Sequence, residues 1–325
     1  MAKYLVTGGA GFIGSNLVEA LVASGDKVVV LDDFRRGPRR NLQDHKPADV
    51  KLIEGDVRDE KEVKKAAKGV DYVLHLASVP GVERSVRNPE ETIDVAATGT
   101  LNVLVAARDL KVKRVVVASS AAVYGESPVL PKEEAMLPTP CSPYGAGMLV
   151  GEDLARVFYA TYRVETVALR LFNVYGPREL PDDPDSGVVV RFIAALLRGH
   201  QPVILGDGKQ SRDFVHVSDV VEAFRLACTA PKAEGEAFNV ASGSRVSIAG
   251  LLAVFNQLLE IEVQPEFKDT RPGDVRHSLA ETMKAQEVLG FRPRMGLHEG
   301  LVKTMLWYRR ALGRSVKLPR ATASS

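Results

Sequence analysis

The glycine-rich segment near the start of the chain restricts the possible folds more than any other feature. Residues Lys3 to Thr7 form an apolar run that predicts a buried strand, and Gly8-Gly-Ala-Gly11-Phe-Ile-Gly14 follows it at once. An amphipathic helix is expected from about Ser15 to Ala23. Gly8 and Gly11 let the backbone turn tightly, and Gly14 lets the helix pack closely on the strand. This order predicts a dinucleotide site, with Phe12 and Ile13 at the helix N-terminus that meets the phosphates.

The acidic residues after the next predicted strand indicate which dinucleotide binds. Lys27 to Leu31 predicts a second strand, and Asp32 and Asp33 end it. Asp32 lies about 20 residues beyond the glycines, where a carboxylate accepts hydrogen bonds from a ribose diol and disfavours a 2′-phosphate. The pattern therefore favours NAD, and Arg35 and Arg36 leave NADP open as the alternative.

Strands and helices continue to alternate along the first half of the chain. Further strands are predicted at 50–54, 71–75, 114–118 and 165–170, and long helices at 88–108 and 144–162. This alternation predicts an α/β fold with a doubly wound parallel Rossmann sheet and a site at the carboxyl ends of its strands. A Pro-, Gly- and Asp-rich loop at 173–187 changes the pattern. We therefore expect an NAD-binding Rossmann domain at 1–172 and, at 173–325, mainly a smaller α/β substrate lobe with some segments that return to the Rossmann domain.

Side chains at the ends of the third and fourth strands are expected to line the cofactor. Asp56 is placed to bond an adenine amino group, with Val57 beside the ring. Leu76 and Ala77 form a wall of apolar residues beneath the cofactor. His75 has no metal-type partner near it in the sequence, so we interpret it as a packed strand residue and expect no metal site.

The segment Ser142-Pro-Tyr-Gly-Ala-Gly-Met148 carries the predicted chemistry. Ser142 suits a helix N-cap and Pro143 the first helical position, which places Tyr144 in the first turn. Tyr144 and Met148 then share one helix face because they are four residues apart. A phenol held beside a serine hydroxyl at a strand end, here Ser119 or Ser120, can exchange a proton with a sugar hydroxyl.

The composition excludes several other classes of protein. The net charge is +2 with basic and acidic residues interspersed, so neither a nucleic-acid partner nor a membrane surface is indicated. Two cysteines, Cys141 and Cys228, cannot form a disulfide framework, which fits a cytoplasmic protein, and Cys141 is expected to be a packing residue. The first residues predict a strand rather than a signal peptide, and no apolar run is long enough for a membrane helix.

With these residues the chain resembles the extended short-chain dehydrogenases/reductases, specifically the NAD-dependent nucleotide-sugar epimerases and dehydratases, and among them the UDP-glucose 4-epimerases. Residues 7–14 match the family's NAD loop, and Ser120 and Tyr144 match its catalytic serine and tyrosine. The resemblance implies that Tyr144 and Met148 also contact the cofactor. It further implies a substrate-binding set made of Ser120, Tyr144, Asn173, Val188, Arg212, Arg271, Asp274 and Ser278.

The resemblance implies epimerisation at C4 of a UDP-hexose, by transient removal and return of a hydride. Arginine forks such as those of Arg212 and Arg271 suit a diphosphate. Related dehydratases and decarboxylases carry an acid just before the Val-Tyr-Gly turn, whereas this chain has Ala121-Ala122, which favours an epimerase. The resemblance implies UDP-glucose and UDP-galactose as substrates. Ser278 stands where some epimerases have an aromatic residue, and the small serine predicts a roomier pocket that would also accept the N-acetylated pair.

Two departures from the family pattern leave other functions open. The family lysine four residues after the tyrosine is Met148 here, and a family asparagine corresponds to Ala96. Without the ammonium group the phenol is harder to ionise, so weakened chemistry is expected. A catalytically quiet NAD- and nucleotide-sugar-binding protein, or a dehydratase or decarboxylase of the same fold, therefore remains an alternative. The resemblance also implies a homodimer through the helices at 88–108 and 144–162.

Overall fold

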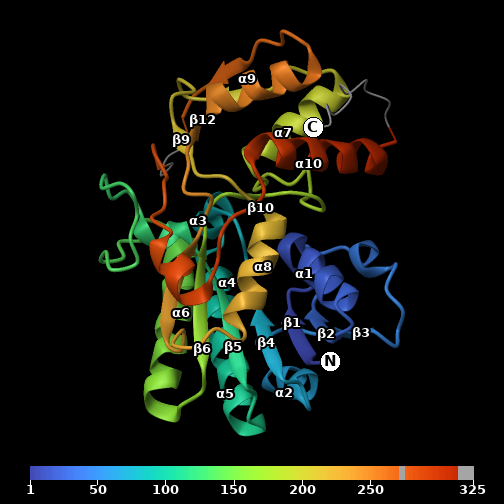
Figure 1. Cartoon of the computed structure of the whole chain (residues 1–325), viewed down its shortest axis with the longest axis vertical. Helices are drawn as coiled ribbons and strands as arrows, with labels where there is room; N and C mark the ends of the chain where they lie inside the picture. The colour runs from blue at the N-terminus through green and yellow to red at the C-terminus, as the bar shows by residue number, and fades with distance from the viewer. Residues whose placement is uncertain (271–274, 314–325) are drawn as a thin grey trace.

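A seven-stranded parallel sheet forms the centre of the computed structural model, which describes residues 1–270 and 275–313 (Figure 1). The strands stand in the order β11-β6-β5-β4-β1-β2-β3, and every neighbouring pair is parallel. The chain builds outward from β1 in one direction and then in the other, which is the doubly wound arrangement that the alternation predicts. The strands are β1 Lys3–Thr7, β2 Lys27–Asp32, β3 Val50–Glu54, β4 Tyr72–His75, β5 Arg114–Ser120, β6 Thr166–Leu171 and β11 Glu236–Val240.

Helices cover both faces of this sheet because its strands are apolar on both sides. On one face, α1 (Phe12–Ala23) packs beside α8 (Val217–Ala227). On the other face lie α2 (Glu60–Ala67), α5 (Thr100–Leu110) and α6 (Pro143–Tyr162). The β5 segment shows the cause, since Val115 and Val117 pack in one core and Val116 in the other.

The long helix predicted at 88–108 is interrupted in the structure. It runs as α4 (Pro89–Asp94), a π-helical turn (Val95–Gly99) and α5. Ala96 lies in the π turn, buried against α6, where a Cβ placed on Gly147 would lie only 2.9 Å from the Ala96 Cβ. The predicted helix is therefore present, and only the π turn within it was not predicted, because this close contact leaves no periodic signal in the sequence.

A second group of elements lies at one end of the molecule, beyond the sheet (Figure 1). Its helices α7 (Val188–Arg198), α9 (Ile248–Leu259) and α10 (Leu297–Ala311) share an apolar core that includes Phe192, Phe255 and Tyr308. Three two-stranded pairs accompany them: β7 (Val174–Tyr175) with β10 (Val215–His216), β8 (Val203–Leu205) with β13 (Glu266–Lys268), and β9 (Ser211–Arg212) with β12 (Val246–Ser247). The remaining elements are α3 (Val82–Arg87) and short helical turns at Arg39–Leu42, Ala121–Tyr124 and Ala285–Leu289.

The two parts of the chain are not strictly consecutive. Strand β11 and helix α8 come after residue 172, yet β11 pairs with β6 and α8 packs on the main sheet. The expected division into domains at 172 stays a prediction. Within the described residues, no helix is long and apolar enough to cross a membrane.

A buried ion pair beneath the predicted serines should contribute strongly to stability. The Glu152 carboxylate on α6 pairs with the Arg170 guanidinium on β6 at 2.8 Å, and their side chains are only 8% and 6% exposed. Removing the carboxylate in Glu152→Ala leaves a buried, uncompensated cation, so we expect a loss of about 3–5 kcal/mol in the free energy of unfolding. Urea unfolding of the variant and the wild type measures this loss.

The neighbouring residue offers a matched control for this prediction. Asp153 pairs with Arg156 at 3.0 Å on the same helix, but both side chains are more than half exposed. Asp153→Ala is expected to cost less than about 1 kcal/mol. Equal losses in the two variants would contradict the assigned role of the buried pair.

Candidate active site

A cavity of about 550 Å³ opens at the carboxyl ends of the sheet strands, where the loops after β1 to β5 meet. All of the predicted cofactor residues line it: Gly8, Gly11, Phe12, Ile13, Gly14, Asp32, Asp33, Asp56, Val57, Leu76, Ala77, Tyr144 and Met148. Ser120 and Asn173 line it as well. The structure therefore brings together residues from seven segments of the sequence.

The glycine turn forms one wall of this cavity and leaves no room for side chains. Gly8 has a φ of +68°, and a Cβ added there would lie 2.8 Å from the Ala77 backbone nitrogen. A Cβ on Gly14 would lie 2.2 Å from the Gly8 carbonyl oxygen. Helix α1 begins at Phe12, earlier than the expected Ser15, so its first N–H groups stand at the cavity. This cradle fits the pyrophosphate of a dinucleotide.

Asp32 has a second role that the sequence did not reveal. Its buried carboxylate accepts the Ala10 N–H at 2.9 Å and the Phe34 N–H at 2.8 Å, so it holds the glycine turn as well as lining the cavity. Burial raises the pKa of Asp32 above its ordinary value, and the two N–H bonds oppose that shift. Each carboxylate oxygen keeps further capacity to accept a hydrogen bond, as a ribose diol requires.

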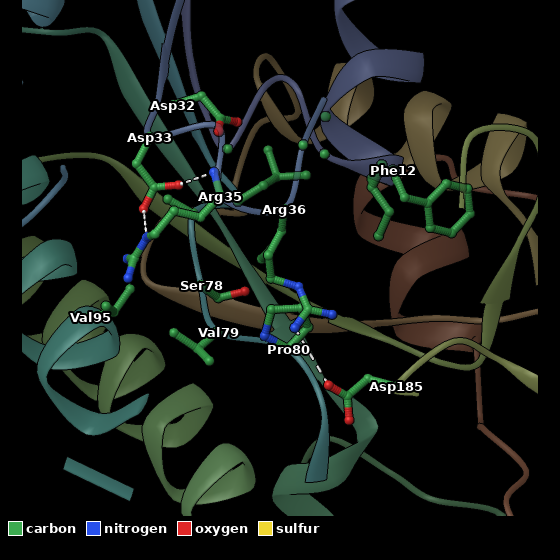
Figure 2. A pocket seen from close by; sticks show the side chains of 18 of the residues that line it. Phe12, Asp32, Asp33, Arg35, Arg36, Ser78, Val79, Pro80, Val95 and Asp185 are labelled. Carbon is green, nitrogen blue, oxygen red and sulfur yellow. Dashed lines mark hydrogen bonds and ion pairs between the residues drawn. The ribbon is translucent and has the colours of Figure 1, made fainter. Parts of the chain in front are cut away.

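Arg35 and Arg36, the two arginines that kept NADP as an alternative cofactor, both form ion pairs with carboxylates. Arg35 pairs with Asp33 at 2.6 Å and with Glu91 at 2.5 Å. Arg36 pairs with Asp183 at 2.6 Å and reaches Asp185 at 3.4 Å, so it crosses from the loop after β2 to the segment before α7 (Figure 2). Guanidinium groups held in this way are poor partners for a 2′-phosphate, which supports NAD.

The link made by Arg36 across the cavity leads to a prediction about cofactor release. Arg36→Met removes the ion pairs with Asp183 and Asp185, which are worth roughly 1 kcal/mol at this partial exposure, so NAD should dissociate about fivefold faster. Stopped-flow displacement of bound NAD measures the rate. Asp183→Asn should act in the same direction. Arg39→Met is the control, because Arg39 pairs with exposed Glu54 and is not part of the cavity lining. An unchanged rate in Arg36→Met would contradict the prediction.

Tyr144 and Ser120, the predicted catalytic residues, both line the cavity. The Ser142 hydroxyl caps α6 by accepting the Gly145 N–H at 3.1 Å, and Pro143 occupies the first turn. Tyr144 is thereby held beside the end of β5, where the Ser120 side chain is near enough to its hydroxyl to lower the pKa of the phenol. Ser120 in turn accepts the Ala122 N–H at 3.1 Å. Burial raises the pKa of the Tyr144 phenol, and the effect of Ser120 opposes this rise only in part.

Met148 both lines the cavity and belongs to a packed cluster. Its side chain is 8% exposed and lies in an apolar group with Val123, Phe172 and Ala241, with Tyr144 packed against the same group. Among the described residues, no charged group contributes to the pKa of the Tyr144 phenol. The described part of the site therefore lacks a cation that would favour a tyrosinate.

Sequence reasoning missed the polar network behind the serines. The Ser119 hydroxyl bonds to Glu152, and the Glu152–Arg170 pair continues to the Tyr124 hydroxyl at 2.9 Å from Arg170. A signal was present, because Glu152 and Arg170 interrupt otherwise apolar faces of α6 and β6. His75 is buried between Thr7 and Thr100, which confirms its interpretation as a packed strand residue. Cys141 is exposed, so its expected packing role is wrong.

A second cavity of about 340 Å³ adjoins the first and contains part of the predicted substrate set. Asn173, Val188 and Arg212 line it, together with Arg191. Asn173 lines both cavities; its Nδ2 donates to the Asp213 carbonyl oxygen at 3.0 Å and lies 3.5 Å from the Ser278 hydroxyl. Arg271 and Asp274 lie outside the described residues.

Comparisons with known proteins agree with this geometry. A model of the NAD dependent epimerase/dehydratase family matches residues 4–241. UDP-glucose 4-epimerase of Mycolicibacterium smegmatis is 38% identical over 310 residues, which covers 94% of this chain and 98% of the relative. Among solved structures, UDP-glucose 4-epimerase of Thermotoga maritima with UDP-glucose superposes with a TM-score of 0.90 at 35% identity, covering 95% of this chain and 99% of that one.

A further solved structure, UDP-glucuronic acid 4-epimerase of Bacillus cereus with UDP-glucuronic acid and NAD, gives a TM-score of 0.87 at 30% identity, again with coverage of 95% and 99%. Family match, overall fold and cofactor cavity point the same way. The chain therefore belongs to the NAD dependent epimerase/dehydratase family, with the fold of the extended short-chain dehydrogenases/reductases and a site for NAD.

Proposed function

We propose that this protein is an NAD-dependent 4-epimerase of a UDP-hexose, with UDP-glucose and UDP-galactose as its substrates. The observation that carries the proposal is the placement of Tyr144 beside Ser120 in the cofactor cavity, which adjoins a second cavity lined by Arg191 and Arg212. One cavity suits the dinucleotide and the other an anionic sugar nucleotide. The names of the similar enzymes, which act on UDP-glucose and UDP-glucuronic acid, support the same substrate class.

The proposed reaction assigns one task to each residue. The chemistry that NAD supplies when bound is reversible acceptance of the hydride from C4 of the sugar. Tyr144 takes the proton from the O4 hydroxyl as that hydride leaves, and returns it when the hydride is added to the opposite face. Ser120 holds the O4 oxygen and the phenol within proton-transfer distance. Atoms and electrons balance over the cycle, since both proton and hydride return to the sugar.

Asn173 and the arginines are proposed to hold the sugar nucleotide. Asn173 lies where the two cavities join, so its side chain suits the sugar at the reacting carbon. Arg212 and the start of α7 at Val188 line the second cavity and suit the diphosphate, as a guanidinium and a helix N-terminus both bind anionic oxygens. The assignment of Arg271 and Asp274 to the same substrate rests on the sequence alone.

The turn after β5 supports an epimerase over a dehydratase or decarboxylase. Ala121 and Ala122 occupy the helical turn that follows Ser120, and neither side chain can move a proton. A dehydratase needs a further acid at that place to expel a hydroxyl group. The epimerase cycle needs only the phenol and the serine.

The small Ser278 is proposed to leave room for N-acetylated sugars. Ser278 lies beside Asn173, so an aromatic ring at this position would narrow the sugar site. Ser278→Tyr is expected to lower kcat/KM for UDP-N-acetylgalactosamine by roughly tenfold more than kcat/KM for UDP-galactose. Parallel steady-state assays with the two sugars measure the ratio. Equal losses for both sugars would contradict this part of the proposal.

A coupled assay tests the proposed function directly. UDP-galactose is supplied to the purified chain, and the UDP-glucose formed is oxidised by an added dehydrogenase whose NADH is recorded. Conversion by the wild-type chain, or by Met148→Lys if the wild type is slow, is the expected result. If neither converts sugar while both bind NAD and UDP-glucose, the quiet binding protein is the correct alternative, which Met148 favours.

The assembly and the location of the protein are also part of the proposal. Leu101 on α5 and Val157 and Tyr162 on α6 are 41–49% exposed, and these helices form the dimer interface in the family that the chain resembles. We propose a homodimer through this face in the cytoplasm, which agrees with two unpaired cysteines. Sedimentation velocity at micromolar concentration distinguishes the dimer from a monomer.

A further inference from the structure

Glu179 is a partly buried acid that the proposed reaction does not use. It lies between β7 and α7 and lines the cofactor cavity. Its Oε1 accepts the Gly187 N–H at 2.6 Å, just before the first residue of α7. Its Oε2 is buried and has no hydrogen-bond partner among the described residues. The only other such atom in the described chain is Nε2 of His216, a residue that lines neither of the two cavities.

The surroundings of Glu179 are fixed from several sides. Its backbone carbonyl accepts the Tyr308 hydroxyl of α10, and the preceding Arg178 pairs with Glu19 of α1 at 2.5 Å. The segment is therefore tied to both parts of the molecule, and the carboxyl cannot swing freely into solvent. Oε2 is thus left without a hydrogen-bond partner beside the cavity that Glu179 lines.

Burial, together with the charges near Glu179, brings the pKa of this carboxyl close to neutral pH. Arg191 of α7 favours the carboxylate, and Asp183 of the same segment opposes it. Burial outweighs both, and the pKa of Glu179 rises to about 7. Arg36 is paired with Asp183 and Arg178 with Glu19, so these two cations are already compensated. The group is thus about half protonated at neutral pH before any ligand binds.

We propose that Glu179 takes up a proton when a diphosphate-bearing ligand binds, and that its Oε2 then donates a hydrogen bond to that ligand. This inference rests on the proposed function for the identity of the ligands. A carboxylate and a diphosphate in one dry cavity repel each other, and the group that can become neutral is the acid. Glu179 shares its cavity with Phe12 at the N-terminus of α1, which favours the NAD pyrophosphate as the partner. Its partner Gly187 lines the second cavity, so the UDP-sugar diphosphate is the other source of the same chemistry.

The direction of the pH effect follows from linkage. If binding raises the pKa of Glu179 above 7, the complex holds more protons than the free protein at pH values above about 7. Affinity should then fall as pH rises, by up to about tenfold for each step of one in pH, until the pKa of the complex is reached. Below about pH 6 the acid is already protonated, and the effect should vanish.

Calorimetry on the full-length chain tests the proposal without any need for turnover. NAD is titrated into cofactor-free protein at about pH 6 and pH 8, in phosphate and in Tris, because these buffers differ in ionisation enthalpy. The wild type should take up about half a proton to one proton at the higher pH and almost none at the lower. Glu179→Gln keeps the shape of the side chain but cannot titrate, so its uptake should disappear and its Kd should no longer rise with pH.

A control and a second ligand make the result specific. Glu91 lines the same cavity but is about one-third exposed and paired with Arg35, so Glu91→Gln should leave the proton count unchanged. UDP-glucose is also titrated into the NAD-loaded protein. This experiment shows whether binding of the UDP-sugar diphosphate, rather than of the NAD pyrophosphate, causes the proton uptake. The proposal is overturned if wild type and Glu179→Gln show the same uptake for both ligands, or if the variant weakens binding equally at the two pH values.

The ligand-free protein gives an independent readout. Because folding raises the pKa of Glu179 from its ordinary value near 4.5 to about 7, the folded chain holds the extra proton in that window and loses stability as pH rises through it. The melting temperature of Glu179→Gln, relative to that of the wild type, should therefore rise as the pH increases from about 5 to about 8. A constant difference would show that the acid does not titrate there. Failure of the epimerase assay would leave both tests intact, since neither depends on catalysis.

Discussion

Tyr144→Phe is expected to lower the turnover of UDP-galactose by about 10²- to 10⁴-fold, the contribution of one positioned acid–base group. The phenylalanine ring fills the same space beside Met148, so only the oxygen beside Ser120 is lost. NAD and UDP-glucose should therefore bind with almost unchanged Kd. Steady-state kinetics and calorimetric binding on the same preparation measure the two effects.

Tyr162→Phe is the control for this variant. Tyr162 is the last residue of the same helix and is 49% exposed, so its hydroxyl should be irrelevant to turnover. Comparable activity of Tyr144→Phe and wild type would show that another group accepts the proton, and the role given to the phenol would have to be abandoned.

Met148→Lys is expected to raise turnover at neutral pH by about 10- to 100-fold and to move the acidic limb of the pH profile to lower pH. Burial raises the pKa of the Tyr144 phenol in the wild type, so the active tyrosinate should form only at alkaline pH. An ammonium group on the same helix face stabilises the anion, and lowering the pKa of the phenol by one is worth about 1.4 kcal/mol. Met148 already lines the cavity, so the longer side chain has space to reach it. The pH dependence of kcat measures this change.

Met148→Leu separates charge from packing in this experiment. Leucine preserves the contacts with Val123 and Phe172 but adds no charge, so its pH profile should match that of the wild type. If the lysine and leucine variants share one profile, the pKa of Tyr144 does not limit the reaction. A wild-type profile that is already flat from about pH 6 to pH 9 would lead to the same conclusion.

Local sequence signals sufficed to predict the sheet and the centre of the site. The glycine turn and the Ser142 cap each depend on residues within a few positions of one another, and both were found where expected, whereas Asp32 depends on a spacing of about 20 residues from the glycines. The placement of Tyr144 beside Ser120 was also predictable, because parallel strands deliver their carboxyl ends to a single edge. The family resemblance added the sugar nucleotide, which the local pattern alone does not indicate.

The contacts that the sequence did not indicate join distant segments. Arg36 meets Asp183 and Asp185 almost 150 positions away, and no period or spacing connects them. Glu179 looked like one more charged residue in a loop, since its burial depends on α1, α7 and α10 together. The π turn at Ala96 and the exposure of Cys141 were likewise decided by packing between helices and loops.

The position of β11 has a consequence for dividing this protein into pieces. Strand β6 ends at Leu171, and the chain returns 65 positions after that residue to lay β11 along it, with Leu171 opposite Val240. Because the two strands are parallel, the intervening segment leaves the sheet at the carboxyl end of β6 and re-enters it at the opposite end, where Glu236 pairs with Val167. A fragment that ends after residue 172 would lose the edge strand β11 and the helix α8 that covers one face of the sheet. The unpaired backbone N–H and C=O groups of β6 would then be exposed to other chains. The seven-stranded sheet is therefore completed only by polypeptide that is synthesised after α7 and β8 of the second group of elements.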